Sequence, residues 1–189
     1  MTLSLTIPRL ETQNLILRGP EARDFDVFST FITDPERSWG FGTEEDRPKA
    51  WRWFASNIGH WALRGFGYFT IEQKATGLSC GITGIWEPEG WPEPEIGWVV
   101  YAGFEGKGIA FEAATRAREW AYTDLGFTTL TSNIVPGNDR SVALAERLGA
   151  HFEREYLNVQ MGTERLFRHP SPADLGLSGD NDGNPEAYA

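Results

Sequence analysis

Cysteine, basic side chains and long apolar runs are all scarce in this chain of 189 residues. Its single cysteine, Cys80, has no partner for a disulfide within the chain. No apolar stretch approaches the ~18 residues that a membrane-spanning helix needs, and the N-terminus has neither the basic nor the apolar segment of a secretory leader. These absences predict a cytoplasmic protein with no membrane partner.

Basic residues are outnumbered, because 17 Lys and Arg face 27 Asp and Glu and give a formal net charge of −10. A protein that follows the phosphates of nucleic acid needs a basic face, so we expect no nucleic-acid partner. The same deficit disfavours anionic membrane surfaces. An acidic chain instead suits a cationic partner or substrate.

The remaining composition is that of an ordinary globular protein, with 40% hydrophobic and 23% charged residues. At about 100–200 residues per domain, the length favours one domain, which we place at residues 1–170. Residues 171–189 are rich in Pro, Gly and Asp and offer little to bury. We expect them to form a flexible acidic C-terminal tail.

Hydrophobic spacing predicts the order of the elements. Strands are expected at 15–18, 67–72, 78–86, 95–101 and 128–135, with one or two more within 151–168; helices are expected at 24–32, 48–63, 108–125 and 138–148. Strands that run together before an alternating portion indicate an α/β (α+β) fold, in which helices cover both sides of one sheet.

The stretch from 99 to 110 carries the clearest chemical signal, because a strand runs through a glycine-rich turn directly into a helix. Such a turn directs unpaired backbone N–H groups at one point, and the helix dipole adds positive potential there. Glycine lets the backbone approach the bound anion closely. A pyrophosphate is the natural ligand, although a turn alone is also compatible with a connection that binds nothing.

Three phosphate-binding motifs compete for this turn. A P-loop needs Ser or Thr after Gly-Lys, whereas Gly108 follows Lys107. A dinucleotide fingerprint needs a further glycine where Phe111 stands. The acetyl-coenzyme A turn, Gln/Arg-x-x-Gly-x-Gly/Ala, matches at Gly108 and Ala110 but has Glu105 at its first position.

Further motifs accompany the turn in a fixed order. They are Leu10-Glu11-Thr12 with 15–18, Glu95-Ile96-Gly97-Trp98, 106–110 with Glu112-Ala113, Asn138-x-x-Ser141, and Arg147-Leu148-Gly149-Ala150. In this order the chain resembles the GNAT superfamily of N-acetyltransferases over about residues 10–170. Within it, the resemblance is strongest to the branch of ribosomal-protein N-terminal acetyltransferases (RimJ/RimL-like).

The resemblance implies a mixed, mostly antiparallel sheet with a V-shaped split between two parallel strands, those that contain 98–100 and 130–134. The pantetheine arm of acetyl-CoA would pair with the first of these strands, its pyrophosphate would lie on the turn 105–110, and no metal is implied. The residues expected to bind this co-substrate are Trp98, Val99, Val100, Glu105, Gly106, Lys107, Gly108, Ile109, Ala110, Asn138, Arg140 and Ser141.

Two positions depart from the family pattern. Glu105 stands where members usually have Gln or Arg, so we expect its side chain to point outward, with Lys107 and Arg140 balancing the phosphate charge. Ala145 stands where many members have a tyrosine that acts as general acid. The common acid is therefore absent.

The predicted reaction is direct attack of an amine on the acetyl thioester, with positioning as a major source of rate. The Val100 N–H is the expected donor to the oxyanion. Ser141, one helical turn from Asn138, is the expected donor to the departing thiolate, unless it only caps its helix. Glu95 is the expected base, through a water molecule, or else an anchor for the substrate ammonium.

The leading hypothesis is thus an acetyl-CoA-dependent N-acetyltransferase that acts on a primary amine, either a protein N-terminus or a small amine. A non-catalytic acyl-CoA-binding or regulatory module is the alternative, and a different acyl donor is a third. The resemblance also allows a homodimer.

Spacing makes two further sets of predictions. Trp51, Trp61 and Trp120 are expected in the core, because they fall on the inward faces of predicted helices. Trp86, Trp91 and Trp98 are expected either to line an acceptor pocket or to pack a loop on the core. Surface or capping positions are expected for the three histidines, His60, His151 and His169.

Overall fold

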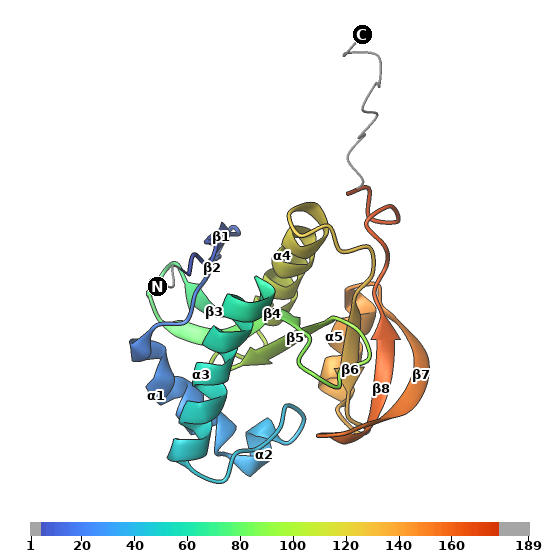
Figure 1. Ribbon diagram of the computed structural model, residues 1–189. Helices are drawn as coiled ribbons and strands as arrows, with labels where there is room; N and C mark the ends of the chain where they lie inside the picture. Colours follow the sequence, from blue (N-terminus) through green and yellow to red (C-terminus); the bar gives the residue numbers. More distant parts are fainter. Residues whose placement is uncertain (1–4, 178–189) are drawn as a thin grey trace.

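The computed structural model describes residues 5–177, which form one mixed sheet flanked by helices (Figure 1). The strands are β1 (Leu10–Glu11), β2 (Leu15–Arg18), β3 (Tyr68–Gln73), β4 (Ser79–Trp86), β5 (Glu95–Val100), β6 (Thr131–Ile134), β7 (His151–Asn158) and β8 (Gly162–Arg168). They lie in the order β1-β2-β3-β4-β5-β6-β8-β7. Neighbours pair antiparallel except β5 and β6, which pair parallel.

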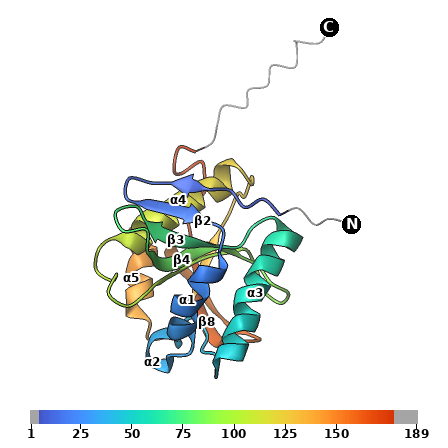
Figure 2. The ribbon, with the colours of Figure 1, turned by 90° about the vertical axis from the view of Figure 1, so that its left-hand side faces the viewer.

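Helices cover both faces of the sheet, as expected. They are the 3-10 turn η1 (Ala22–Asp24), α1 (Phe25–Ile32), α2 (Pro35–Ser38), α3 (Arg47–Arg64), α4 (Ile109–Thr123) and α5 (Asp139–Arg147). α4 lies on one face, and α1 and α3 lie on the other (Figure 2). α3 begins where Asp46 accepts a hydrogen bond from the Lys49 N–H and ends at Gly65, whose φ of 79° suits glycine.

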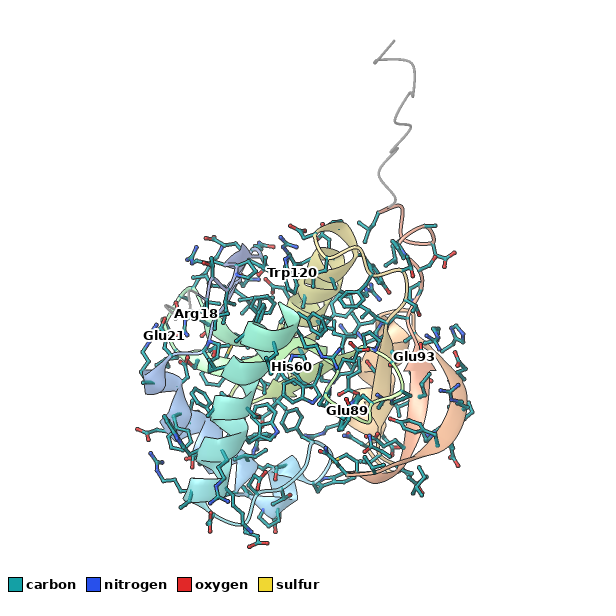
Figure 3. The ribbon with its side chains drawn as sticks, viewed as in Figure 1. Arg18, Glu21, His60, Glu89, Glu93 and Trp120 are labelled. Carbon is teal, nitrogen blue, oxygen red and sulfur yellow. The ribbon has the colours of Figure 1, made fainter. Side chains whose placement is uncertain are left out.

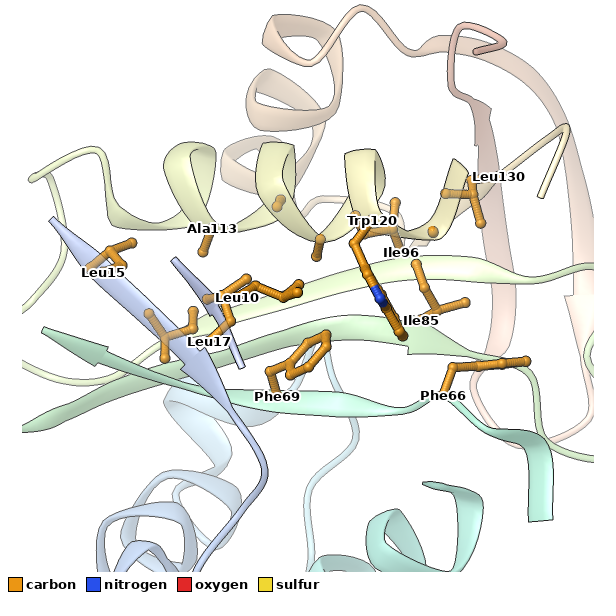
Figure 4. Close-up of a cluster of buried hydrophobic side chains, with 14 of the residues drawn as sticks. Leu10, Leu15, Leu17, Phe66, Phe69, Ile85, Ile96, Ala113, Trp120 and Leu130 are labelled. Carbon is orange, nitrogen blue, oxygen red and sulfur yellow. The ribbon is translucent and has the colours of Figure 1, made fainter. Parts of the chain in front are cut away.

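The main core lies between α4 and the sheet (Figure 4). Trp120 of α4 packs there against Phe69 of β3, and Trp61 of α3 completes the contact, so two of the three predicted core tryptophans are confirmed. Trp51 is 50% exposed, and that prediction is wrong. It lies near the beginning of α3, where its ring contacts those of Phe25 and Phe54. These two belong to a second hydrophobic cluster, the α1 cluster, which also contains Phe28, Phe31, Ile32, Ala50, Tyr68, Ile82, Val99 and Tyr101.

The V-shaped split follows from how briefly β5 and β6 pair. Their only registered pair is Glu95 with Thr131, whereas β5 continues along β4 to Val100. Along an antiparallel ladder the hydrogen-bonded pairs alternate, and the Tyr101 N–H donates to β4. The backbone groups of Trp98 and Val100 therefore point away from β4, into the split.

Several local features differ from the sequence predictions. The strand expected from residue 128 begins only at Thr131, and the short elements β1, η1 and α2 were not predicted. For α2 a signal was available, because Asp34 caps the helix and Pro35 occupies its first turn. Residues 171–177 form hydrogen-bonded turns, and Leu175 and Leu177 pack against the α4 cluster. The tail expected from residue 171 is therefore wrong for 171–177; the rest of it lies outside the described residues.

Between residues 5 and 177, no helix combines the length and apolarity needed to cross a bilayer. The same range contains no group of three or more His, Cys, Asp or Glu side chains arranged to hold a metal ion.

A buried carboxylate fastens the beginning of α1 to the sheet. Asp24 accepts two hydrogen bonds from Arg18, at 2.7 and 2.9 Å, together with one from Thr70 and one from Ser79. Its Oδ2 also accepts from the Glu21 N–H. Because β2, β3 and β4 each supply a partner, this network fixes the beginning of α1 against three strands of the sheet.

Replacing Asp24 by Ala should lower the free energy of unfolding by about 3–5 kcal/mol, because the buried Arg18 guanidinium loses both hydrogen bonds to Asp24 and keeps Glu72 as its main counter-charge. Urea unfolding measures the change. The matched control is Asp26→Ala in the same helix, where the carboxylate is exposed and paired with Arg47, and it should cost about 0–1 kcal/mol. Equal losses in the two variants would contradict this account.

Candidate active site

A cavity of about 790 Å³ opens beside the split between β5 and β6. Its walls come from α3, the segment 40–44, the loop that precedes β5, and the β7–β8 turn. Four residues predicted from the sequence line it, namely Glu95, Trp98, Asn138 and Ser141. Val99, Val100, the turn 105–110 and Arg140 are not among its lining residues.

Glu95 is the first residue of β5, and it is only 9% exposed. Its Oε2 accepts a 2.5 Å hydrogen bond from the Asn133 amide, across the apex of the split. Burial, and then the nearby Glu164 carboxyl, raise the pKa of Glu95 to about 8. A carboxyl with this pKa can take a proton near neutral pH, which is what a general base must do.

Glu164 is a second acidic residue in the cavity that the sequence analysis missed. It accepts hydrogen bonds from the Tyr156 hydroxyl at 2.7 Å and the Asn158 amide at 2.8 Å, and burial raises its pKa. The available signal was its spacing on β8. Glu164 and Leu166 stand two residues apart and therefore face the same side of the sheet, and both are buried. Glu44 and Glu89 also line the cavity, with Arg64 as the basic counterpart, so the cavity suits a cation.

Stacked rings form the wall on the α3 side. Trp53 stacks between Phe28 and Trp86, with ring centroids 4.9 and 5.6 Å away, and Trp86 stacks on His60 at 4.3 Å. The sequence left pocket and packing roles open for Trp86, Trp91 and Trp98, and all three line the cavity. Because aromatic faces attract cations, this wall supports the same ligand class as the acids.

His60 is a neutral part of this wall, and the expectation of a surface position is wrong (Figure 3). Its Nε2 accepts a hydrogen bond from the Glu87 N–H at 3.1 Å, so its proton lies on Nδ1 and is donated to the Phe66 carbonyl at 2.7 Å. Burial lowers the pKa of His60. His169 is buried as well, and burial lowers its pKa to about 3.

Asn138 and Ser141 meet the cavity at the beginning of α5. The Asn138 Oδ1 accepts a hydrogen bond from the Ser141 N–H at 3.2 Å, so Asn138 caps the beginning of α5. A Cβ on Gly40 would stand 2.4 Å from the Asn138 Nδ2, so glycine is needed for the segment 40–44 to close over α5. Ala145 is fully buried against β6 and β8, away from the cavity.

The glycine turn leads into α4 as predicted. Gly106 and Gly108 have φ values of 73° and 77°, which favour glycine. The first N–H groups of α4 have no partner within the helix, so they remain free for an anion. Lys107 donates from Nζ to the Gly103 carbonyl at 2.7 Å and closes the turn.

Glu105 is exposed, and its carboxylate is held by two partners. Its carboxylate accepts a hydrogen bond from the Gly103 N–H at 2.8 Å and is paired with Arg37 of α2. Arg37 also donates to the Val100 carbonyl at 3.4 Å. The acidic side chain at this position is thus neutralised by a cation from an element that the sequence analysis did not predict.

Comparison with known protein families agrees with this geometry. The family model described as the acetyltransferase (GNAT) domain matches residues 14–151 of the chain. The chain belongs to the GNAT acetyltransferase family. The GNAT family uses acetyl-CoA, and its mostly antiparallel sheet with one parallel pair is the observed fold. Membership in the family therefore confirms the coarse prediction, and it leaves the acceptor open.

Two solved structures and one sequence relative illustrate the similarity. The acetyltransferase of Agrobacterium tumefaciens str. C58 has a TM-score of 0.80 and 35% identity, over 90% of this chain and 98% of that one. The uncharacterized protein YkkB of Bacillus subtilis (strain 168) is 28% identical over 149 residues, 77% of this GNAT chain and 87% of YkkB. Spermidine N-acetyltransferase of Vibrio cholerae, in complex with CoA and spermine, shares the fold, with a TM-score of 0.69 and 16% identity over 86% and 98% of the two chains.

The raised pKa of Glu95 makes a prediction about stability. The folded protein keeps this proton up to about pH 8, whereas the unfolded chain loses it near the ordinary value of 4.5. Between these values the unfolded state binds fewer protons, so the free energy of unfolding falls as pH rises. Glu95→Gln removes this contribution and should lose less stability than wild type between pH 5 and pH 8. Urea unfolding at both pH values measures it, and equal losses would refute the assignment.

Proposed function

We propose that this protein transfers an acetyl group from acetyl-CoA to a cationic primary amine by direct attack. The proposal rests on two features that meet where β5 and β6 separate, a free strand edge and an acidic cavity. The backbone edge of β5 at Trp98 and Val100 has no neighbouring strand among residues 5–177, and it suits an amide-bearing arm. The cavity beside it contains Glu95, with its raised pKa, and an acidic, aromatic wall.

The residues that would hold acetyl-CoA fit its chemistry. The free N–H groups at the beginning of α4, together with Lys107 and Arg140, would bind the pyrophosphate. Backbone groups of Trp98 and Val100 would pair with the pantetheine arm. Val99 lies between them with its backbone paired to Ile82 of β4 and its side chain buried, so it offers the arm no group of its own. The Val100 N–H points into the split, where it would donate to the acetyl oxygen.

Acetyl-CoA supplies a thioester whose carbonyl carbon the amine attacks. Glu95 accepts a proton from the substrate ammonium through water, which frees the nitrogen lone pair. A carbon–nitrogen bond then forms while the Val100 N–H stabilises the oxyanion. The nitrogen gives its second proton to solvent, and the carbon–sulfur bond breaks as the carbonyl re-forms. Ser141 donates a hydrogen bond to the departing thiolate, which then takes a proton from solvent. Ala145 can supply no acid.

The acceptor is the finer part of the proposal. An acidic cavity with an aromatic wall favours a cation, which includes both a small amine and a protein N-terminus. The spermine-bound neighbour shows that this fold accommodates a polycationic ligand. The ribosomal-protein branch rests on the order of the sequence motifs alone.

A non-catalytic acyl-CoA-binding module is the second candidate. Glu105 and Ala145 are the observations that favour it, because both replace residues common among active relatives. The pairing of Glu105 with Arg37 weakens the first argument, since the acid no longer carries an uncompensated charge at the turn.

The test is thiol release from acetyl-CoA with a panel of amines that contains small diamines, an aminoglycoside and peptides with free N-termini. We expect at least one amine to exceed the hydrolysis blank. Glu95→Gln should lower kcat/KM about 100- to 1,000-fold, because a positioned base contributes this much, and should remove the dependence of the rate on ionisation near pH 8. Glu155→Gln, at an exposed position of β7 that does not line the cavity, is the matched control and should change kcat/KM less than about threefold. Tight CoA binding without transfer to any amine would favour the binding module.

The pairing of Arg37 with Glu105 makes a prediction about cofactor affinity. Arg37→Ala leaves an uncompensated carboxylate beside the pyrophosphate site, and the Kd of CoA should rise about tenfold. Glu105→Gln should bind CoA at least as tightly as wild type, and the double variant should recover most of the loss. Arg47→Ala, which breaks a surface ion pair elsewhere, is the control. Isothermal titration calorimetry measures each Kd; no rescue in the double variant would contradict this account.

A further inference from the structure

The side chain of Tyr68 reaches the cavity by passing over two glycines on the neighbouring strands. It pairs with Gly84 of β4, which pairs with Gly97 of β5, so the three lie side by side across the sheet. A Cβ on Gly97 would stand 2.1 Å from the Tyr68 hydroxyl oxygen. The ring of Tyr68 therefore extends from β3 over β4, and its hydroxyl rests on the backbone of β5.

This position places the hydroxyl beside Glu95. Alternate residues of a strand face the same side, so Glu95 precedes the bare position of Gly97 on one face of β5. Tyr68 and Glu95 both line the cavity. The electrostatic influence of the Glu95 carboxyl on the phenol, which raises the pKa of Tyr68, is consistent with this proximity.

Every hydrogen bond that Tyr68 makes within residues 5–177 uses its backbone: the Asn57 amide and the Trp61 indole donate to its carbonyl, and its N–H donates to Asn57. Its hydroxyl therefore has no partner in this range. The hydroxyl is also not among the unpaired side-chain atoms that are shut off from solvent, which are Trp91 Nε1 and Asn133 Oδ1. Because Tyr68 lines the cavity, the hydroxyl oxygen is open to the cavity and available to a bound ligand.

The ring itself cannot move easily. Phe41, Trp53 and Trp86 surround it, with centroids 5.6, 5.9 and 5.4 Å from its own. Burial, and then Glu95 and Glu164, raise the pKa of Tyr68 well above 10. A phenol in this state keeps its proton throughout the reaction, so it neither acts as the base nor protonates the thiolate. It remains a fixed hydrogen-bonding group.

We propose that Tyr68 positions the acceptor: its hydroxyl oxygen accepts an N–H of the attacking amine beside Glu95, which turns the nitrogen lone pair toward the split. The inference rests on the proposed acetyl transfer and adds a residue to the acceptor side of that site. This arrangement requires glycine at position 97, because any side chain there would displace the Tyr68 hydroxyl.

The test compares Tyr68→Phe with Tyr101→Phe, which removes a hydroxyl from an equally buried tyrosine of the same cluster that does not line the cavity. With an amine that wild type acetylates, Tyr68→Phe should lower kcat about 10- to 100-fold through lost orientation. The Kd of CoA should stay within twofold of wild type, and the dependence of rate on Glu95 ionisation near pH 8 should remain. Tyr101→Phe should leave kcat within twofold.

Gly97→Ala provides a second, independent variant, because its Cβ pushes the hydroxyl away while Tyr68 itself is retained; it should lower kcat with the same amine. Rates of Tyr68→Phe within twofold of wild type, or equal losses in Tyr68→Phe and Tyr101→Phe, would overturn the inference while acetyl transfer stands. Absence of transfer by the wild-type protein with every amine would instead refute the proposed function, and this inference with it.

Discussion

The separation of β5 from β6 is the constraint on which the site depends. Two parallel strands that pair only at Glu95 and Thr131 leave half of the β5 edge without backbone partners. Backbone N–H and C=O groups near a protein interior need partners, so this edge is a strand-shaped binding surface. The cavity opens at the same apex, and the chemistry that both can perform together follows from their meeting there.

The apex is held by a chain of hydrogen bonds whose direction is fixed. A guanidinium can only donate, so the 3.2 Å contact of Arg118 with His169 makes Nδ1 the acceptor and leaves the histidine proton on Nε2. His169 therefore donates to Ser132 at 2.9 Å, and Ser132 donates to the Ile96 carbonyl at 2.7 Å. Ser132 lines the cavity, yet its proton is committed to joining β6 to β5. It is a structural residue rather than a nucleophile.

Whether a site residue could be predicted from the sequence depends on whether its partners lie near it in the chain. Glu95, Gly108 and Asn138 were found because strand, turn and helix cap are local patterns. Tyr68 was missed because its importance depends on two glycines on other strands, which only the register brings together. The partners of His60 are backbone groups of Phe66 and Glu87, which no side-chain pattern reveals.

Electrostatics link the buried acids to the substrate they suit. With no cation nearby, burial and Glu164 favour the protonated form of Glu95. A substrate ammonium in the cavity reverses this balance, because an opposite charge at close range favours the carboxylate. Once the ammonium gives up its proton, the reversal ends and Glu95 again holds a proton readily. A carboxyl whose pKa falls as the ammonium arrives and rises as the ammonium loses its charge thereby follows the needs of a general base.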